Sequence, residues 1–231
     1  MYNQELTAER VREQSTFISK VYAWMSVALL ITGVTAMATA SNAQLMEMIF
    51  SSQLVFFALI IGEFALVWYL SSRIQSMSAQ TATYLFFVYS VLNGLTLAVI
   101  FLVYTQSSIV TTFFISAGTF SAMSAYGYFT KKDLTSMGKI LTMALIGIII
   151  ASVVNMFVES TMIEKIVNYV GVLVFVGLTA YDTQKIKNIY AGEAGTDEFK
   201  KLSIMGALTL YLDFINLFLF LLRIFGGRRD D

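Results

Sequence analysis

The sequence predicts an all-α polytopic membrane protein with seven transmembrane helices. Hydrophobic residues make up 57% of the 231 positions and charged residues only 13%, whereas a soluble domain carries about 25% charged residues. Seven apolar stretches approach the roughly 20 residues that a helix needs to cross a bilayer. None of them shows the alternation of apolar and polar residues that is typical of a membrane β-barrel strand. Helices in lipid are therefore the expected architecture.

The seven stretches follow one another with short loops between them. They cover residues 21–40, 54–70, 83–104, 109–129, 140–158, 166–181 and 203–225. The first stretch is longer than the apolar run of a cleavable signal peptide, so we expect a retained helix. No linker rich in Pro, Gly or Ser divides the chain. We therefore predict an N-terminal arm (1–20), one membrane domain (21–225) and a short charged tail (226–231).

Positive charge is distributed unevenly among the loops. Lys and Arg concentrate in the N-terminal arm and in the second, fourth and sixth loops, whereas the loops between them carry only Lys165. The positive-inside rule then predicts a cytoplasmic N-terminus. Arg228 and Arg229 follow the last stretch and oppose this assignment if that helix crosses fully. Either the last helix is re-entrant or the earlier loops outweigh the tail, and we favour a full crossing.

Three residue types that carry much protein chemistry are absent, namely His, Cys and Pro. Without His or Cys, the chain has no zinc site of the usual ligand types, no Ser–His or Cys–His nucleophile and no disulfide. No Gly-rich phosphate loop and no basic patch for nucleic acid is present. We therefore expect no enzyme activity and no cofactor, with the lipid bilayer as the principal partner.

Few charged residues lie within or against the apolar stretches. Glu63, Asp182 and Asp213 are the acids, and Arg73 and Arg223 lie near helix ends. A charge at mid-membrane costs about 2.5–3.5 kcal/mol on insertion scales, so such residues usually face a bundle interior and mark an ion or proton pathway. We take these acids as the candidate functional residues.

Asp213 lies about ten residues into its stretch, roughly 15 Å along a helix. Helical spacing places small and polar residues on the same face: Gly206, Thr209 and Asn216. Thr209 and Asn216 are therefore predicted to support Asp213 with hydrogen bonds. The alternative is that a neutral Asp213 only ties two helices together.

Asp182 closes the sixth stretch, but the helical pattern can continue through Ile186 and Ile189, which would place Asp182 inside the bundle. Antiparallel sixth and seventh helices then bring Asp182 and Asp213 to a similar depth. Two carboxylates in contact at low dielectric cannot both ionise cheaply, so they titrate as a unit. The singly protonated pair clamps two helices, and its deprotonation creates a site for a hard cation such as calcium.

Four motifs resemble one known family. They are ALTLYLDFINLFL (207–219), GLTAYDTQ (177–184), GLTL (94–97) and AYGY (125–128). These stretches are similar to the transmembrane Bax inhibitor motif (Bax inhibitor-1) family in its bacterial branch. The resemblance implies a seven-helix fold in which the last helix is surrounded by the other six.

The resemblance also implies a function and a location. Family members are linked to calcium leak across membranes, with an aspartate pair as pH sensor, and that pair matches Asp182 and Asp213. An acid and an arginine on the second helix, where the arginine latches to the pair, match Glu63 and Arg73 by position. A bacterial cytoplasmic (inner) membrane is the implied location.

Three functions compete at this stage. The first is a pH-sensitive cation channel, most readily for calcium, with Asp182 and Asp213 as cation ligands in the pathway. The second is a non-transporting regulator that binds another membrane protein, such as a membrane-bound protease. The third, an intramembrane aspartyl protease, fits poorly because Leu210-Tyr211-Leu212 precedes Asp213 and the chain has no proline for the later motif of that class.

Overall fold

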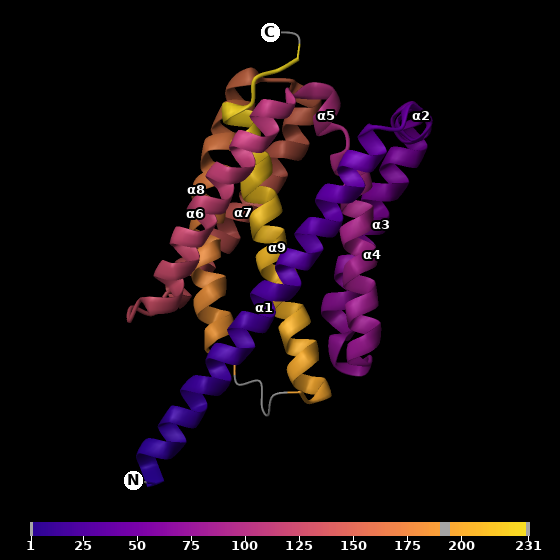
Figure 1. Ribbon diagram of the computed structural model, residues 1–231. Helices are drawn as coiled ribbons and strands as arrows, with labels where there is room; N and C mark the ends of the chain where they lie inside the picture. The colour runs from indigo at the N-terminus through magenta and orange to yellow at the C-terminus, as the bar shows by residue number, and fades with distance from the viewer. Residues whose placement is uncertain (1, 190–194, 230–231) are drawn as a thin grey trace. The chain divides into compact units, whose positions relative to one another are not determined.

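A computed structural model describes residues 2–189 and 195–229, with side chains from residue 12 onward. Within these ranges the chain is helical and contains no strand, only an isolated bridge between Tyr104 and Arg228. Figure 1 shows the helices. They are α1 (Tyr2–Ala40), α2 (Ala43–Phe50), α3 (Gln53–Arg73), the 3-10 turn η1 (Ile74–Ser76), α4 (Ala79–Leu97), α5 (Ile100–Val103), α6 (Gln106–Phe129), α7 (Thr135–Val158), α8 (Thr161–Lys187) and α9 (Asp197–Phe225).

Seven helical segments of the described chain are long and apolar enough to cross a membrane. They are Arg12–Ala40, Gln53–Ser76, Ala79–Val103, Gln106–Phe129, Thr135–Val158, Thr161–Lys187 and Asp197–Phe225. These segments confirm the predicted fold class, and they extend beyond most of the predicted stretches because polar residues continue the helices past the apolar runs. The protein is an integral membrane protein.

Hydroxyl side chains start several of the long helices. Ser52, Ser78, Thr105 and Ser160 each have an extended backbone and accept a hydrogen bond from the N–H three residues ahead. Such N-caps satisfy amide groups that the first helical turn leaves unpaired. They set the helix boundaries in a chain that has no proline to do so. The short helix α2 was not predicted, and it begins with the same device at Asn42.

The chain forms two compact units, which we call unit 1 (residues 1–103 and 189–211) and unit 2 (residues 104–188 and 212–231). In unit 1, α4 packs against both α1 and α3. In unit 2, α8 packs against both α6 and α7, and these three helices run alongside one another in Figure 1. Each unit is thus built around one helix that has two neighbours.

Helix α9 belongs to both units, since its residues up to Tyr211 lie in unit 1 and those from Leu212 onward lie in unit 2. It is also the most buried candidate span: 72% of its apolar window is buried, against 39% for the next highest, Ala79–Val103. The predicted central role of the last helix is confirmed.

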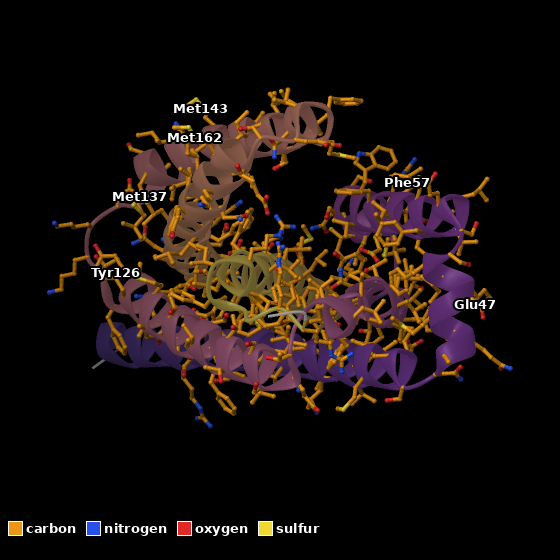
Figure 2. The ribbon with its side chains drawn as sticks, turned by 90° about the horizontal axis from the view of Figure 1, so that it is seen from above. Glu47, Phe57, Tyr126, Met137, Met143 and Met162 are labelled. Carbon is orange, nitrogen blue, oxygen red and sulfur yellow. The ribbon has the colours of Figure 1, made fainter. Side chains whose placement is uncertain are left out.

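The outer sides of the helices are apolar. Figure 2 labels Phe57 on α3, Met143 on α7 and Met162 on α8 at the periphery, and these side chains are 49%, 63% and 71% exposed. Large apolar side chains facing outward are what a lipid solvent requires.

The tail after α9 is held against the start of α6 within unit 2. The Gly227 carbonyl accepts from Thr105 N at 3.0 Å, and Gly227 N donates to Ser108 Oγ at 2.9 Å. Residues 104–108 lie at the end of unit 2 opposite the α6–α7 loop, because α6 runs from one to the other. The tail and the α6–α7 loop therefore lie at opposite ends of unit 2. A full crossing by α9 stays a prediction.

Candidate functional site

Asp182 lies on α8, which continues past the apolar stretch to Lys187, so the helix includes Ile186 but ends before Ile189. The residue is therefore five positions inside the helix, and its side chain is only 8% exposed. Asp213 lies in the unit 2 part of α9 and is 5% exposed. Two acidic side chains from different helices are thus withdrawn from solvent within the same unit.

The two carboxyl groups are close enough to form a hydrogen bond with each other when one of them is protonated. Asp213 Oδ2 is buried and has no hydrogen-bond partner in the described part of the chain. An ionised carboxylate can only accept hydrogen bonds, so a carboxyl–carboxyl bond needs a proton on one partner. A pair that shares one proton is compatible with this arrangement, and the role of the two residues as the functional site stays a prediction.

Glycines on two neighbouring helices let α8 come close where it carries Asp182. A Cβ atom at Gly127 of α6 would fall on the backbone carbonyl of Ala180. A Cβ at Gly138 of α7 would lie 2.5 Å from the ring of Tyr181. Because only glycine fits at these contacts, α8 is fixed from both sides just before Asp182.

Polar contacts continue this support on the other side of Asp182. Thr183 Oγ1 lies 3.4 Å from Ser124 Oγ of α6. Gln184 Oε1 accepts from Leu134 N at 2.8 Å, and Gln184 Nε2 donates to the Lys132 carbonyl at 2.8 Å. The Gln184 side chain therefore joins α8 to the α6–α7 loop both as hydrogen-bond acceptor and as donor.

Other glycines have the sequence spacing of close helix packing but lie in open surroundings. The small-residue pairs Gly118/Ala122 and Gly147/Ala151 have the four-residue spacing of helix-packing motifs, yet no described atom lies within 4 Å of a Cβ built at Gly118 or Gly147. Spacing alone does not tell which side of a helix meets protein and which meets lipid.

The two supporting residues predicted beside Asp213 bond to their own helix. Thr209 Oγ1 donates to the Met205 carbonyl at 3.1 Å, and Asn216 Nδ2 donates to the Leu212 carbonyl at 2.8 Å. Each satisfies its donor one turn back along α9. Their support of Asp213 stays a prediction.

Glu63 belongs to unit 1 and has its own polar partners there. Its carboxylate accepts from Thr96 Oγ1 at 2.7 Å and from Asn93 Nδ2 at 3.2 Å, both on α4. Arg73 is exposed in the last turn of α3, ten residues further along the same helix. The latch between Arg73 and the aspartate pair stays a prediction, and the structure adds Asn93 and Thr96 as the groups that hold Glu63.

Further hydrogen bonds connect the Glu63 carboxylate, through Asn93, to Tyr211 and Thr32. Asn93 Oδ1 accepts from the Tyr211 hydroxyl at 2.9 Å, and that hydroxyl lies 2.7 Å from Thr32 Oγ1 of α1. Thr32 also contacts the Ser90 carbonyl at 2.9 Å. We call Thr32, Glu63, Asn93, Thr96 and Tyr211 the unit 1 network; it joins α1, α3, α4 and the first half of α9. Sequence reasoning missed four of its five members because uncharged polar residues are common in membrane helices.

Tyr211→Phe tests this network. The substitution keeps the ring but removes the donor for Asn93 and the partner of Thr32, which leaves buried polar atoms unpaired at a cost of about 1–3 kcal/mol. We expect a lower midpoint of thermal unfolding for the purified protein. Tyr84→Phe, on the exposed side of α4, is the matched control and should leave the midpoint unchanged. Equal midpoints for the two variants would show that the Tyr211 hydroxyl carries no stabilising bond.

The acidic residues do not assemble into a larger cluster. Among the described residues, no group of three or more Asp or Glu side chains is positioned to hold a metal ion. Calcium usually takes six to eight oxygen ligands. Cation binding by Asp182 and Asp213 would therefore need further oxygens from carbonyls, hydroxyls or water.

The protein is a polytopic membrane protein with seven helical spans, and it carries a buried carboxyl pair on its last two long helices. The chain matches the family described as inhibitor of apoptosis-promoting Bax1 over residues 14–230. It therefore belongs to the Bax inhibitor-1 family, which confirms the resemblance of its motifs.

Relatives of similar length occur in several bacteria. The inner membrane protein YbhL of Escherichia coli is 54% identical, covering 93% of this chain and 92% of its own. A protein of Borreliella burgdorferi is 47% identical over 98% and 99% of the two chains. A membrane protein of Streptococcus pyogenes is 35% identical over 93% of each chain. The similarity thus extends over almost the whole length of these proteins.

Proposed function

We propose that the protein is a pH-sensitive leak pathway for cations, calcium in particular, gated by Asp182 and Asp213. The observation that carries this proposal is the burial of two carboxyl groups on α8 and α9 that lie close enough to interact with each other. Acidic residues inside membrane helices usually mark an ion or proton pathway because they are costly to place there. A purely structural bond between helices would not need two ionisable groups.

Proton loss is the gating event in this proposal. While the pair holds one proton, its hydrogen bond ties α8 to α9. When the pH rises and the proton leaves, two carboxylates face each other, their hydrogen bond is gone, and they repel. Cation passage should therefore increase as the pH rises and decrease as the pH falls.

The choice of calcium follows from the chemistry of the two deprotonated carboxylates. Two carboxylate groups present up to four oxygen atoms and two negative charges, which hard cations prefer. Because the pair offers fewer ligands than a storage site, it would hold calcium weakly, and weak binding suits an ion that must leave again.

The membrane and orientation follow from the relatives and the charges. The Escherichia coli relative is named as an inner membrane protein, and we assign this chain to the equivalent membrane. The loops rich in Lys and Arg would face the cytoplasm, together with the N-terminus, while the tail after α9 would face the opposite side.

Calcium entry into liposomes tests the proposed function. The purified full-length protein is reconstituted into vesicles loaded with a calcium-sensitive dye, and the initial rate of entry is measured from mildly acidic to mildly alkaline pH. We expect a rate above that of protein-free vesicles that rises with pH. A rate equal to that of protein-free vesicles at every pH would overturn the proposal.

A further inference from the structure

A second buried oxygen atom in unit 2 lacks a hydrogen-bond partner. Among the described residues, three buried side-chain atoms have no such partner: Trp24 Nε1, Asn168 Oδ1 and Asp213 Oδ2. Asn168 lies on α8, in unit 2, and its side chain is 5% exposed. Asn168 and Asp213 thus supply the two oxygen acceptors that the described part of the chain buries without a donor.

The unpaired amide oxygen of Asn168 is costly inside a membrane helix. A buried acceptor loses its hydrogen bonds to water, and without a donor in the protein it regains nothing. Buried polar side-chain atoms therefore usually have a partner. Two other asparagines of unit 2 follow this rule: Asn155 Oδ1 accepts from Ser160 N at 3.0 Å, and Asn216 Nδ2 donates to the Leu212 carbonyl at 2.8 Å. The Asn168 oxygen is thus available to a ligand from outside the chain.

Asn168 lies on the same side of α8 as Asp182. The fourteen positions between them correspond to nearly four helical turns, about 21 Å along the axis. Gly171 and Phe175 lie between them on the buried side of the helix. The Phe220 ring stacks on Phe175 with ring centres 5.8 Å apart, and a Cβ at Gly171 would lie 2.6 Å from it. An apolar layer therefore separates the Asn168 oxygen from the carboxyl pair, so the two form separate sites along the interior of unit 2.

Buried hydroxyl groups of α6 lie at the level of Asn168. Helices α6 and α8 pack against each other and run in the same direction, since α7 returns the chain between them; they meet where Gly127 lies against Ala180. Ser116 precedes Gly127 by eleven positions and Asn168 precedes Ala180 by twelve, so both lie about 16–18 Å back from that contact. Ser116 and Thr112 are buried, and Ser116 Oγ donates to the Thr112 carbonyl at 2.8 Å. A hydroxyl that donates can still offer its oxygen as a ligand.

We propose that Asn168 is a second cation-binding position in unit 2, with its amide oxygen as a ligand and the Ser116 and Thr112 hydroxyls at the same level. This assignment rests on the proposed function and adds to the carboxyl pair a site without charge. Amide, hydroxyl and water oxygens are ligands that calcium accepts. Because uncharged ligands hold calcium less tightly than carboxylates do, Asn168 suits a path in which an ion passes between successive weak sites. Helix α8 begins at the end of unit 2 that holds the tail, so a cation from that end reaches Asn168 before Asp182.

The calcium dependence of entry into liposomes tests this assignment on the full-length protein. The initial rate is measured against calcium concentration at one alkaline pH, which gives the concentration at which the rate is half-maximal. Asn168→Leu removes the oxygen ligand and should raise this concentration about tenfold, the effect of losing one bond to a charged group. Asn168→Asp replaces the amide by a charged oxygen ligand and should lower it. In Asn168→Leu the ratio of alkaline to acidic rates should keep its wild-type value, because the carboxyl pair is intact.

Asn155→Asp is the matched control, since it adds the same charge near the end of α7 and should leave the half-maximal concentration unchanged. Asn168→Leu replaces an unpaired polar group by an apolar one, so its midpoint of thermal unfolding without calcium should equal or exceed that of the wild type. A lower midpoint would show that the amide makes a structural bond, and the assignment would be wrong. It would also be wrong if wild-type vesicles admit calcium and Asn168→Leu keeps the wild-type half-maximal concentration, an outcome that leaves the proposed function standing. If wild-type vesicles admit no calcium, the proposed function and this assignment fail together.

Discussion

Asp213→Asn should make calcium entry into liposomes independent of pH. The amide has the shape of the carboxyl group and can still donate a hydrogen bond to Asp182, but it cannot lose a proton in this range. The pair would then keep one arrangement at every pH. The ratio of entry rates between the alkaline and acidic ends of the range, which exceeds one in the wild type under our proposal, should fall to about one.

The partner substitution and a control sharpen this result. Asp182→Asn should have the same effect, and the double variant should be no more severe than either single one, because the two residues act as a unit. Glu164→Gln removes an acid from the first turn of the same helix, α8, and should leave the pH profile unchanged. A wild-type pH profile in Asp213→Asn would remove the pair from the gating mechanism even if calcium still enters.

Gly127→Ala should be the most destabilising of the small substitutions in unit 2. The added methyl group would fall on the Ala180 carbonyl, a backbone atom that cannot turn aside. Overpacking of this kind costs about 1–3 kcal/mol and sometimes more. We expect a lower midpoint of thermal unfolding, and, because Ala180 lies two residues before Asp182, we also expect a changed pH response of calcium entry.

Gly118→Ala in the same helix is the matched control. Apart from the adjoining backbone of its own helix, no described atom lies within 4 Å of the added carbon, and alanine favours a helix over glycine by up to about 1 kcal/mol. This variant should be as stable as the wild type or more so. If Gly127→Ala proved equally stable, the close approach of α6 and α8 at Ala180 would be wrong.

The sequence was sufficient to predict the seven spans. It also singled out two acids that the structure buries on α8 and α9, while their function stays a prediction. Asp182 and Asp213 stood out because ionised groups are rare in apolar stretches, and the helical pattern through Ile186 indicated that Asp182 lies inside the helix. The contacts of Gly227 with residues 105 and 108 join positions that are distant in sequence, so no local pattern predicts where the tail lies in unit 2.

Other features could not be read from the sequence for a physical reason. Gly127 and Gly118 are both small residues in the same helix, and only the neighbouring helix distinguishes the tight contact from the open one. Likewise, Thr32 and Tyr211 are 179 positions apart, and their hydrogen bond depends on packing that local pattern does not contain. The free-energy cost of placing an uncharged polar side chain in a membrane is small, so such residues are common there and a single one does not indicate a network.

The distance between the carboxyl oxygens of Asp182 and Asp213, measured in experimental structures at low and high pH, tests the central claim most directly. We predict a distance within hydrogen-bonding range at low pH, where the pair holds its proton. At high pH we predict a longer distance with water or a cation between the oxygens. A separation beyond a hydrogen bond at both pH values, with neither water nor ion between the groups, would contradict a proton-sharing gate.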